Sequence, residues 1–165
     1  MNELKSATRQ ASAYDVDFAA WTADQARRLR AVKPAGLDWE NVAEEVESLG
    51  RSDRRAVGSA LKVILEHLIK WRFQAEKRSS SWSDSIEEHR DRISRILDDS
   101  PSLAGLPEKS LEHEYRRARR KALRDTALSP ESIPTTSPFT SAQALDPDFW
   151  PDAEPDGTPR TERGR

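Results

Sequence analysis

The stretch Leu61-Lys-Val-Ile-Leu-Glu-His-Leu-Ile-Lys-Trp71 is the most apolar segment of the chain. Its apolar side chains recur every three or four residues, as they do on the buried face of a helix. At about 100° per residue, one broad arc contains Val57, Leu61, Ile64, Leu65, Leu68, Trp71 and Arg72. This arc predicts the central helix of a helical bundle.

The composition also favours amphipathic helices. Charged residues make up 34% of the 165 residues and hydrophobic residues 35%, which suits one compact domain with a tail. The net charge of −2 produces no overall field toward nucleic acid or acidic membranes. The chain has no cysteine, which excludes disulfides, thiolate catalysis and the usual structural zinc sites.

The N-terminal residues 1–13 lack the apolar core of a signal peptide. No apolar run reaches the length of about 18 residues that a membrane-spanning helix needs. We therefore expect a cytoplasmic protein without membrane contact.

The periodicity predicts an all-α fold, a five-helix antiparallel bundle. The first helix covers residues 14–32, with one face formed by Phe18, Trp21, Gln25, Leu29 and Val32. The second follows a cap at Asp38 and ends at Gly50, a common residue after a helix. The third runs from about residue 52 to 78. Residues 37–50 hold five acids and no base, whereas residues 51–78 hold eight bases and three acids, so we expect these two helices to pair.

The last two helices are expected at residues 82–98 and 108–125. The first of them presents Trp82, Ile86, His89, Ile93, Ile96 and Leu97 on one face, and the second has a narrow stripe of Leu111, Tyr115, Ala118 and Ala122.

Residues 129–152 are rich in proline but carry five apolar anchors, which predict an irregular wrap over the bundle: Ile133, Phe139, Leu145, Phe149 and Trp150. Thr140 or Ser141 is expected to cap a single helical turn within the wrap. The domain organisation expected is a mobile leader at 1–13, a single all-α domain at 14–152 and a disordered tail at 153–165.

The sequence gives no sign of a metal or cofactor site. Di-iron bundles use Glu-x-x-His on two helices, but the residues three before His67, His89 and His113 are not glutamates. No two histidines stand four residues apart, and no glycine-rich loop or nucleophile motif is present. We expect no metal and no cofactor.

A candidate polar site lies around the end of the third helix. Its residues are Glu45, His67, Lys70, Gln74, Arg78 and Trp82. Glu45 and His67 lie at the margins of their apolar stripes, so an antiparallel helix pair predicts a contact between them. Such a contact would raise the pKa of His67 above about 6.5. The alternative is structural: Trp71 and Trp82 are core residues, and Arg78 satisfies nearby carbonyl groups.

A basic stripe on the fifth helix is a candidate anion-binding surface. Arg117, Arg120 and Arg124 share an outer face with His113, which could contact phosphates. The alternative is a solvated face that pairs with the acids of residues 129–152. No aromatic residue interleaves with these arginines, so nucleic-acid binding is the less favoured reading.

Several of these motifs occur together in one known family. The run Leu37-Asp-Trp-Glu-Asn-Val-Ala-Glu44-Glu45-Val-Glu-Ser48-Leu49-Gly50, followed by His67-Leu-Ile-Lys70-Trp71, Gln74, Arg78 and Trp82, resembles the bacterial family catalogued as domain of unknown function 29. The family usually has proline where this chain has Ala75. The resemblance covers about residues 14–152 and implies an all-α fold without a settled activity.

Three functions remain open from the sequence. The first is a protein-interaction or regulatory module without chemistry of its own, for which a homodimer is one option. The second is an enzyme or small-ligand binder that uses the polar site. The third is weak nucleic-acid binding through the fifth helix.

Overall fold

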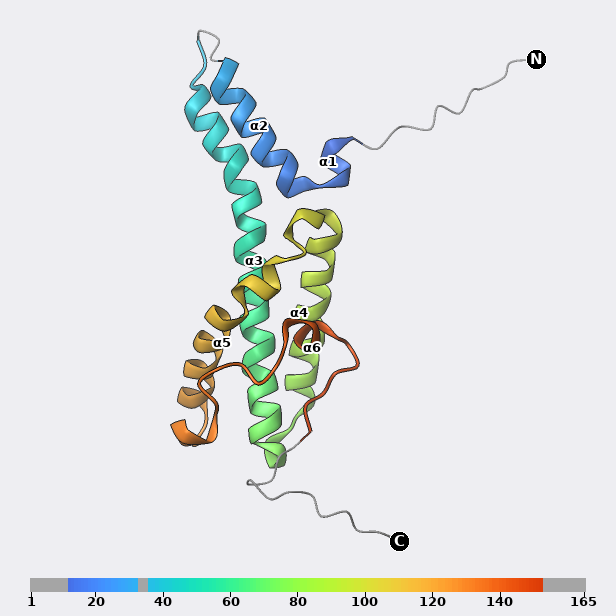
Figure 1. The fold of residues 1–165 in the computed structure, drawn as a ribbon, viewed down its shortest axis with the longest axis vertical. Helices are drawn as coiled ribbons and strands as arrows, with labels where there is room; N and C mark the ends of the chain where they lie inside the picture. Colours follow the sequence, from blue (N-terminus) through green and yellow to red (C-terminus); the bar gives the residue numbers. More distant parts are fainter. Residues whose placement is uncertain (1–11, 33–35, 153–165) are drawn as a thin grey trace, which may run out of the picture. The chain divides into compact units, whose positions relative to one another are not determined.

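The computed structural model describes residues 12–32 and 36–152 and is all-α, as the periodicity predicts (Figure 1). Within these ranges no strand is formed. The helices are α1 (Ala13–Val16), α2 (Phe18–Val32), α3 (Trp39–Phe73), α4 (Ser80–Asp99), α5 (Leu106–Asp125) and α6 (Ser141–Leu145). Three short 3-10 turns are η1 (Ala75–Lys77), η2 (Pro101–Leu103) and η3 (Pro130–Ser132). Most of the expected leader, and the whole of the expected tail, lie outside the described residues.

The predicted second and third helices form one continuous helix, α3, so the expected break at Gly50 is wrong. Gly50 is buried against α2, where a Cβ would lie 2.5 Å from Thr22 Oγ1 and 3.5 Å from the Ala19 carbonyl oxygen. The glycine therefore permits a close helix–helix approach instead of ending the helix. Asp38 caps the start of α3 as expected, because its carboxylate accepts a hydrogen bond from the Asn41 amide (3.3 Å).

The predicted first helix is divided into α1 and α2 at Asp17, whose backbone is extended. The Asp17 carboxylate accepts hydrogen bonds from the amide of Ala20 (2.8 Å) and the amide of Ser102 (2.6 Å). It therefore caps the start of α2 and fixes η2 beside it. Contacts between Cα atoms divide the described chain into two compact units, which are considered separately.

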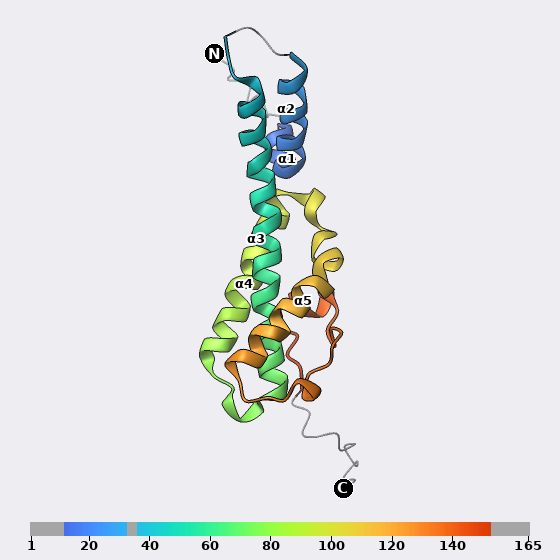
Figure 2. The ribbon, with the colours of Figure 1, turned by 90° about the vertical axis from the view of Figure 1, so that its left-hand side faces the viewer.

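The first unit contains residues 12–32, 36–55 and 95–104. In it, α2 packs antiparallel against the first part of α3 (Figure 2). Arg30 on α2 forms ion pairs with Glu40 (3.1 Å) and Glu47 (2.8 Å) on α3. The acidic segment of α3 is thus paired with Arg30 of α2 and also with Arg51, the first base of residues 51–78, which binds Glu44 and lies 3.6 Å from Glu47 on the same helix.

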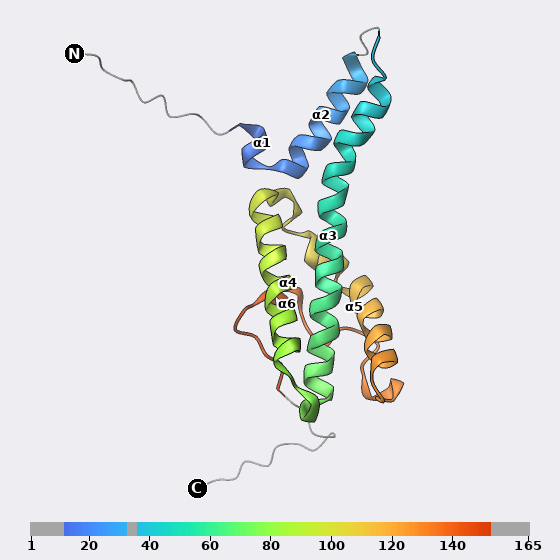
Figure 3. The same cartoon turned by 180° about the vertical axis from the view of Figure 1, so that it is seen from behind.

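The second unit contains residues 56–94 and 105–152. Here the remaining part of α3 lies between α4 and α5 (Figures 1 and 3). The predicted stripe is confirmed, because five of its residues are completely buried: Val57, Leu61, Ile64, Leu65 and Leu68. Trp71 and Arg72 are only half-buried. Ile86 and Ile93 from α4 and Tyr115, Ala118 and Ala122 from α5 complete this core.

The expected C-terminal wrap is confirmed. The segment after α5, residues 126–152, is called the strap below, and it runs back over the second unit (Figure 1). Ile133 and Phe139 are buried, at 1% and 2% exposure, while Phe149 and Trp150 are half-buried. The expected helical turn is α6, and Thr140 caps it in a reciprocal capping box with Gln143.

No helix in the described ranges is long and apolar enough to cross a membrane. The expectation that residues 14–152 fold as a single domain stays a prediction.

Candidate functional site

The polar residues at the end of α3 form a buried ion network. Glu66 and Lys70 are one turn apart and are only 6% and 7% exposed. Lys70 Nζ donates to Glu66 Oε1 at 2.7 Å and to Asp125 Oδ2 at 3.0 Å. Lys121 Nζ donates to Asp125 Oδ1 at 2.6 Å. The network therefore ties α3 to the last turn of α5.

The charges in this network are stabilised by their partners. Burial lowers the pKa of Lys70, but the hydrogen bonds to Glu66 and Asp125 outweigh it and raise the pKa overall. Hydrogen bonds from Lys121 and Lys70 lower the pKa of Asp125 from 3.8 to about 2. Lys70 is therefore protonated at neutral pH, which makes it unsuitable as a general base or a nucleophile.

The lowered pKa of Asp125 predicts an acid-dependent loss of stability. A carboxyl group whose pKa is depressed in the folded state stabilises the protein fully above its unfolded pKa, about 4. That contribution disappears as the pH falls toward 2. We expect wild type to melt at a higher temperature than Asp125→Asn at about pH 5, with the difference vanishing near about pH 2. Thermal unfolding followed by circular dichroism measures this, and a difference that is constant with pH would contradict it.

His67 is not paired with Glu45, and that prediction is wrong. The two residues lie on one helix, roughly six turns apart. The half-buried ring of His67 places Nδ1 2.9 Å from the Val63 carbonyl oxygen, one turn earlier. Burial lowers the pKa of His67 instead of raising it. Because the folded state favours the neutral ring, it binds a proton less readily than the unfolded state does. His67 therefore lowers the free energy of unfolding as the pH falls below about 6.5.

The other members of the predicted polar site are used by the fold. Gln74 is buried at 5% exposure, and its backbone N–H donates to the Lys70 carbonyl oxygen (2.9 Å). Arg78 Nε donates to the Trp71 carbonyl oxygen at 2.9 Å, and its guanidinium lies 4.9 Å from the centre of the Trp71 ring. Trp82 is half-buried in the first turn of α4. These contacts favour the structural reading of the residues around Lys70. The turn after α3 also forms with Ala75 in place of proline, as η1.

The sequence reading missed Arg90, which holds the strap. Arg90 is 5% exposed and donates to three carbonyl oxygens: Ala144 (2.9 Å), Pro147 (3.3 Å) and Phe149 (2.9 Å). Its guanidinium also lies 5.4 Å from the centre of the Trp150 ring. Arg90 lies about 40° from Ile86 and about 60° from Ile93 around the helix, within the buried arc of α4. A charged residue at that position was the available signal.

Helix α5 holds the other part of the strap. The hydroxyl of Tyr115 donates to the Pro134 carbonyl oxygen at 2.7 Å, and burial raises the pKa of Tyr115 to about 12. Arg119 donates to the carbonyl oxygens of Ile133 (3.0 Å) and Pro130. The strap is therefore fixed by side chains that bind its backbone.

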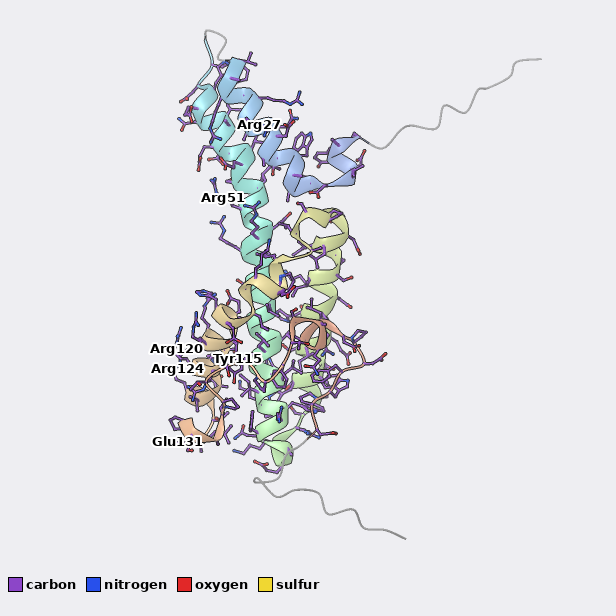
Figure 4. All side chains as sticks on the ribbon, in the orientation of Figure 1. Arg27, Arg51, Tyr115, Arg120, Arg124 and Glu131 are labelled. Atoms are coloured by element: carbon purple, nitrogen blue, oxygen red, sulfur yellow. The ribbon has the colours of Figure 1, made fainter. Side chains whose placement is uncertain are left out.

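The predicted basic stripe lies on the outer side of α5. Figure 4 shows Arg120 and Arg124 on this side, whereas Tyr115 faces α3. Arg117 donates to Glu114 at 2.8 Å. Arg120 and Arg124 form no ion pair with any residue that the structure describes. The expected pairing of these three arginines with the acids of residues 129–152 is not found there.

In the part of the chain that the structure describes, no three His, Cys, Asp or Glu side chains are grouped as ligands of a metal ion would be.

Comparison with known proteins adds fold information but no activity. The pattern of one family, described as Domain of unknown function DUF29, matches residues 13–150. A similar solved structure is an α-helical protein of unknown function from Rhodospirillum rubrum, with a TM-score of 0.66 and 25% sequence identity. The alignment covers 85% of this chain and 93% of that one. No curated protein sequence matches significantly.

Proposed function

The chain belongs to the DUF29 family, which assigns no chemistry, and we propose that it is a protein-interaction module that dimerises through the α2–α3 hairpin of its first unit. The observation that carries this proposal is the distribution of large and small residues in the hairpin. Its helices bury small side chains against each other: Ala19, Thr22, Ala26, Ala43 and Gly50. Large apolar residues remain outside that contact.

Four large apolar residues of the hairpin and of the connection within it are exposed. Val32 is 67% exposed, Leu37 62%, Leu49 49% and Val42 41%. The face that the sequence predicted to be buried on α2 is instead half-buried at Phe18, Trp21 and Leu29. A contiguous exposed apolar patch larger than a few hundred Å² is typical of an interaction site.

Helix geometry places these residues on one face of the hairpin. On α2 the stripe of large side chains (Phe18, Trp21, Leu29, Val32) is rotated about the helix axis by about 90° from the stripe of small side chains (Ala19, Thr22, Ala26). On α3 the large stripe (Val42, Val46, Leu49) is rotated by about 80° in the same sense. Two antiparallel helices are related by a two-fold axis perpendicular to the plane that contains both helix axes. Stripes that are rotated in the same sense about the two helix axes therefore lie on the same side of that plane. We call this surface the hairpin face.

A second copy of the chain is the occupant that fits this face. Two helices form only one layer, and another hairpin would supply the second layer of a four-helix core. The rim of the face carries Arg28 on α2, Glu45 on α3 and Asp38 directly before α3. A two-fold contact that places α2 of one copy beside α3 of the other brings these opposite charges together. Two-fold dimers are also the commonest soluble oligomers.

Sedimentation velocity tests the proposal. Wild type is expected to sediment as a dimer, and Val42→Lys combined with Leu49→Lys is expected to sediment as a monomer, because each charge would replace an apolar contact worth about 1.5–3 kcal/mol. The matched control is Ala23→Lys, which adds a charge at an exposed position on the other side of the hairpin. Circular dichroism verifies folding, and Leu49→Gln serves if the double variant unfolds. A monomeric wild type, or a control that also dissociates, overturns the proposal.

A further inference from the structure

The outer face of α5 carries cations without any acid among them. At about 100° per residue, the cationic face lies within an arc of about 100° and consists of Lys109, His113, Arg116, Arg117, Arg120 and Arg124. All six residues are exposed, and they extend along about 22 Å of helix. The buried residues of α5, such as Tyr115 and Ala118, lie on the opposite side.

Four acids lie on α5 outside the cationic face, and three of them have partners, whereas Glu108 in the first turn is exposed. Glu112 accepts a hydrogen bond from the Ser137 amide at 3.2 Å, and Asp125 accepts from Lys70 and Lys121. Glu114 is 6% exposed and lies against Gly58 of α3, where its carboxylate accepts from Arg117. Apart from Glu108, the helix thus separates its charges: carboxylates face α3 and the strap, and cations face outward.

Most of the outward cations have no counter-charge within the chain. Lys109, Arg116, Arg120 and Arg124 form no ion pair with any described residue. Arg119, by contrast, donates to the strap carbonyls and lies outside the cationic face. The fold therefore uses the inner cations of α5 and leaves the outer ones available.

We propose that the cationic face binds an acidic segment of a partner protein, a helix that presents carboxylates on successive turns. Lys109, His113, Arg116, Arg120 and Arg124 repeat at the spacing of helical turns, so a row of carboxylates at i and i+4 on a second helix matches them one for one. Arginine guanidinium groups bind carboxylates through two parallel hydrogen bonds. This site uses different residues from the hairpin face and does not depend on dimerisation.

The alternative polyanion, duplex nucleic acid, fits less well. A duplex carries one phosphate charge per about 1.7 Å, or roughly 13 over the length of the cationic face, whereas the face offers six groups. The face contains no aromatic residue for stacking and no Asn or Gln for reading base edges. The net charge of −2 on the chain also opposes a dense polyanion.

Fluorescence anisotropy at about 150 mM salt tests the proposal with three labelled probes. These are an alanine-rich helical peptide with glutamates at i and i+4, the same peptide with glutamine in their place, and a duplex DNA of similar length. The full-length protein is expected to bind the glutamate peptide more tightly than either other probe. Arg116→Gln with Arg120→Gln and Arg124→Gln is expected to weaken this binding roughly tenfold.

The matched control removes the same charge elsewhere: Arg54→Gln with Arg55→Gln and Arg92→Gln, all at exposed positions. It is expected to change the affinity by less than about twofold. Glutamine is a good helix former, and circular dichroism verifies that both variants stay folded. The proposal is overturned if the glutamate peptide does not bind, if the duplex binds more tightly, or if the control weakens binding as much as the α5 variant.

Discussion

Replacement of Arg90 by methionine is expected to lower the free energy of unfolding by about 3–5 kcal/mol. Methionine keeps most of the side-chain length but has no donor for the carbonyl oxygens of Ala144, Pro147 and Phe149, which Arg90 binds at 2.9, 3.3 and 2.9 Å. Buried carbonyl groups without a donor cost about 1–3 kcal/mol each. The cation beside the Trp150 ring is lost as well. Urea denaturation followed by circular dichroism measures the change.

Arg92→Met is the control for Arg90→Met. Arg92 is exposed on the same helix, so its replacement is expected to change stability by less than about 0.5 kcal/mol. Hydrogen exchange locates the effect: amides of residues 141–150 are expected to lose protection in Arg90→Met, while those of α2 keep it. A loss of stability below about 1 kcal/mol, or a uniform loss of protection, would show that Arg90 does not hold the strap.

The sequence predicts the features of this fold that depend on local spacing. The stripe from Val57 to Leu68 is completely buried, and the anchors Ile133 and Phe139 are buried in the strap. Asp38 and Thr140 cap helices as expected. These residues could be read correctly because periodicity and capping involve positions only a few residues apart.

Features that depend on distant residues could not be read in the same way. A glycine can end a helix or permit close packing of two helices. At Gly50 it permits close packing, because Ala19 and Thr22 of α2 lie against it. For α2 itself, the sequence favoured the stripe of large residues as the buried face. The small stripe is buried instead, because α3 approaches closely at Gly50. The large side chains of α2 are therefore left on the hairpin face.

The polar site was predicted less well than the fold for the same reason. Glu45 was included because two separate helices were expected to meet, and the continuity of α3 removes it. Arg90 was left out because a charged residue at a core position is recognised only when its partners are known. Those partners are backbone carbonyls of the strap, about 55 residues later in the chain, and side-chain periodicity carries no information about them.

Replacement of Lys70 by methionine is expected to cost about 3–5 kcal/mol of stability, because Glu66 is left as a buried carboxylate without a cation. Glu66 is only 6% exposed, and Lys70 Nζ is its ion-pair partner at 2.7 Å. Asp125 keeps its hydrogen bond from Lys121, so the loss of Lys70 destabilises this carboxylate less. Replacing both members of the pair, by Glu66→Leu with Lys70→Met, is expected to restore most of the stability, since well-packed apolar residues often substitute for a buried ion pair without loss.

This pair of variants separates a structural role of Lys70 from a ligand-binding role. A structural ion pair predicts a large loss in Lys70→Met and recovery in the double variant, both measured by urea denaturation. Asp125→Asn removes the other carboxylate partner of Lys70 and is expected to cost only about 0–1 kcal/mol at neutral pH, because the aspartate is more exposed and the pair is screened by solvent. If Lys70→Met instead costs less than about 1 kcal/mol, the ion pairs of Lys70 with Glu66 and Asp125 do not stabilise this end of α3. Lys70 would then be free to serve a bound molecule, and the polar site at the end of α3 would replace the hairpin face as the leading candidate.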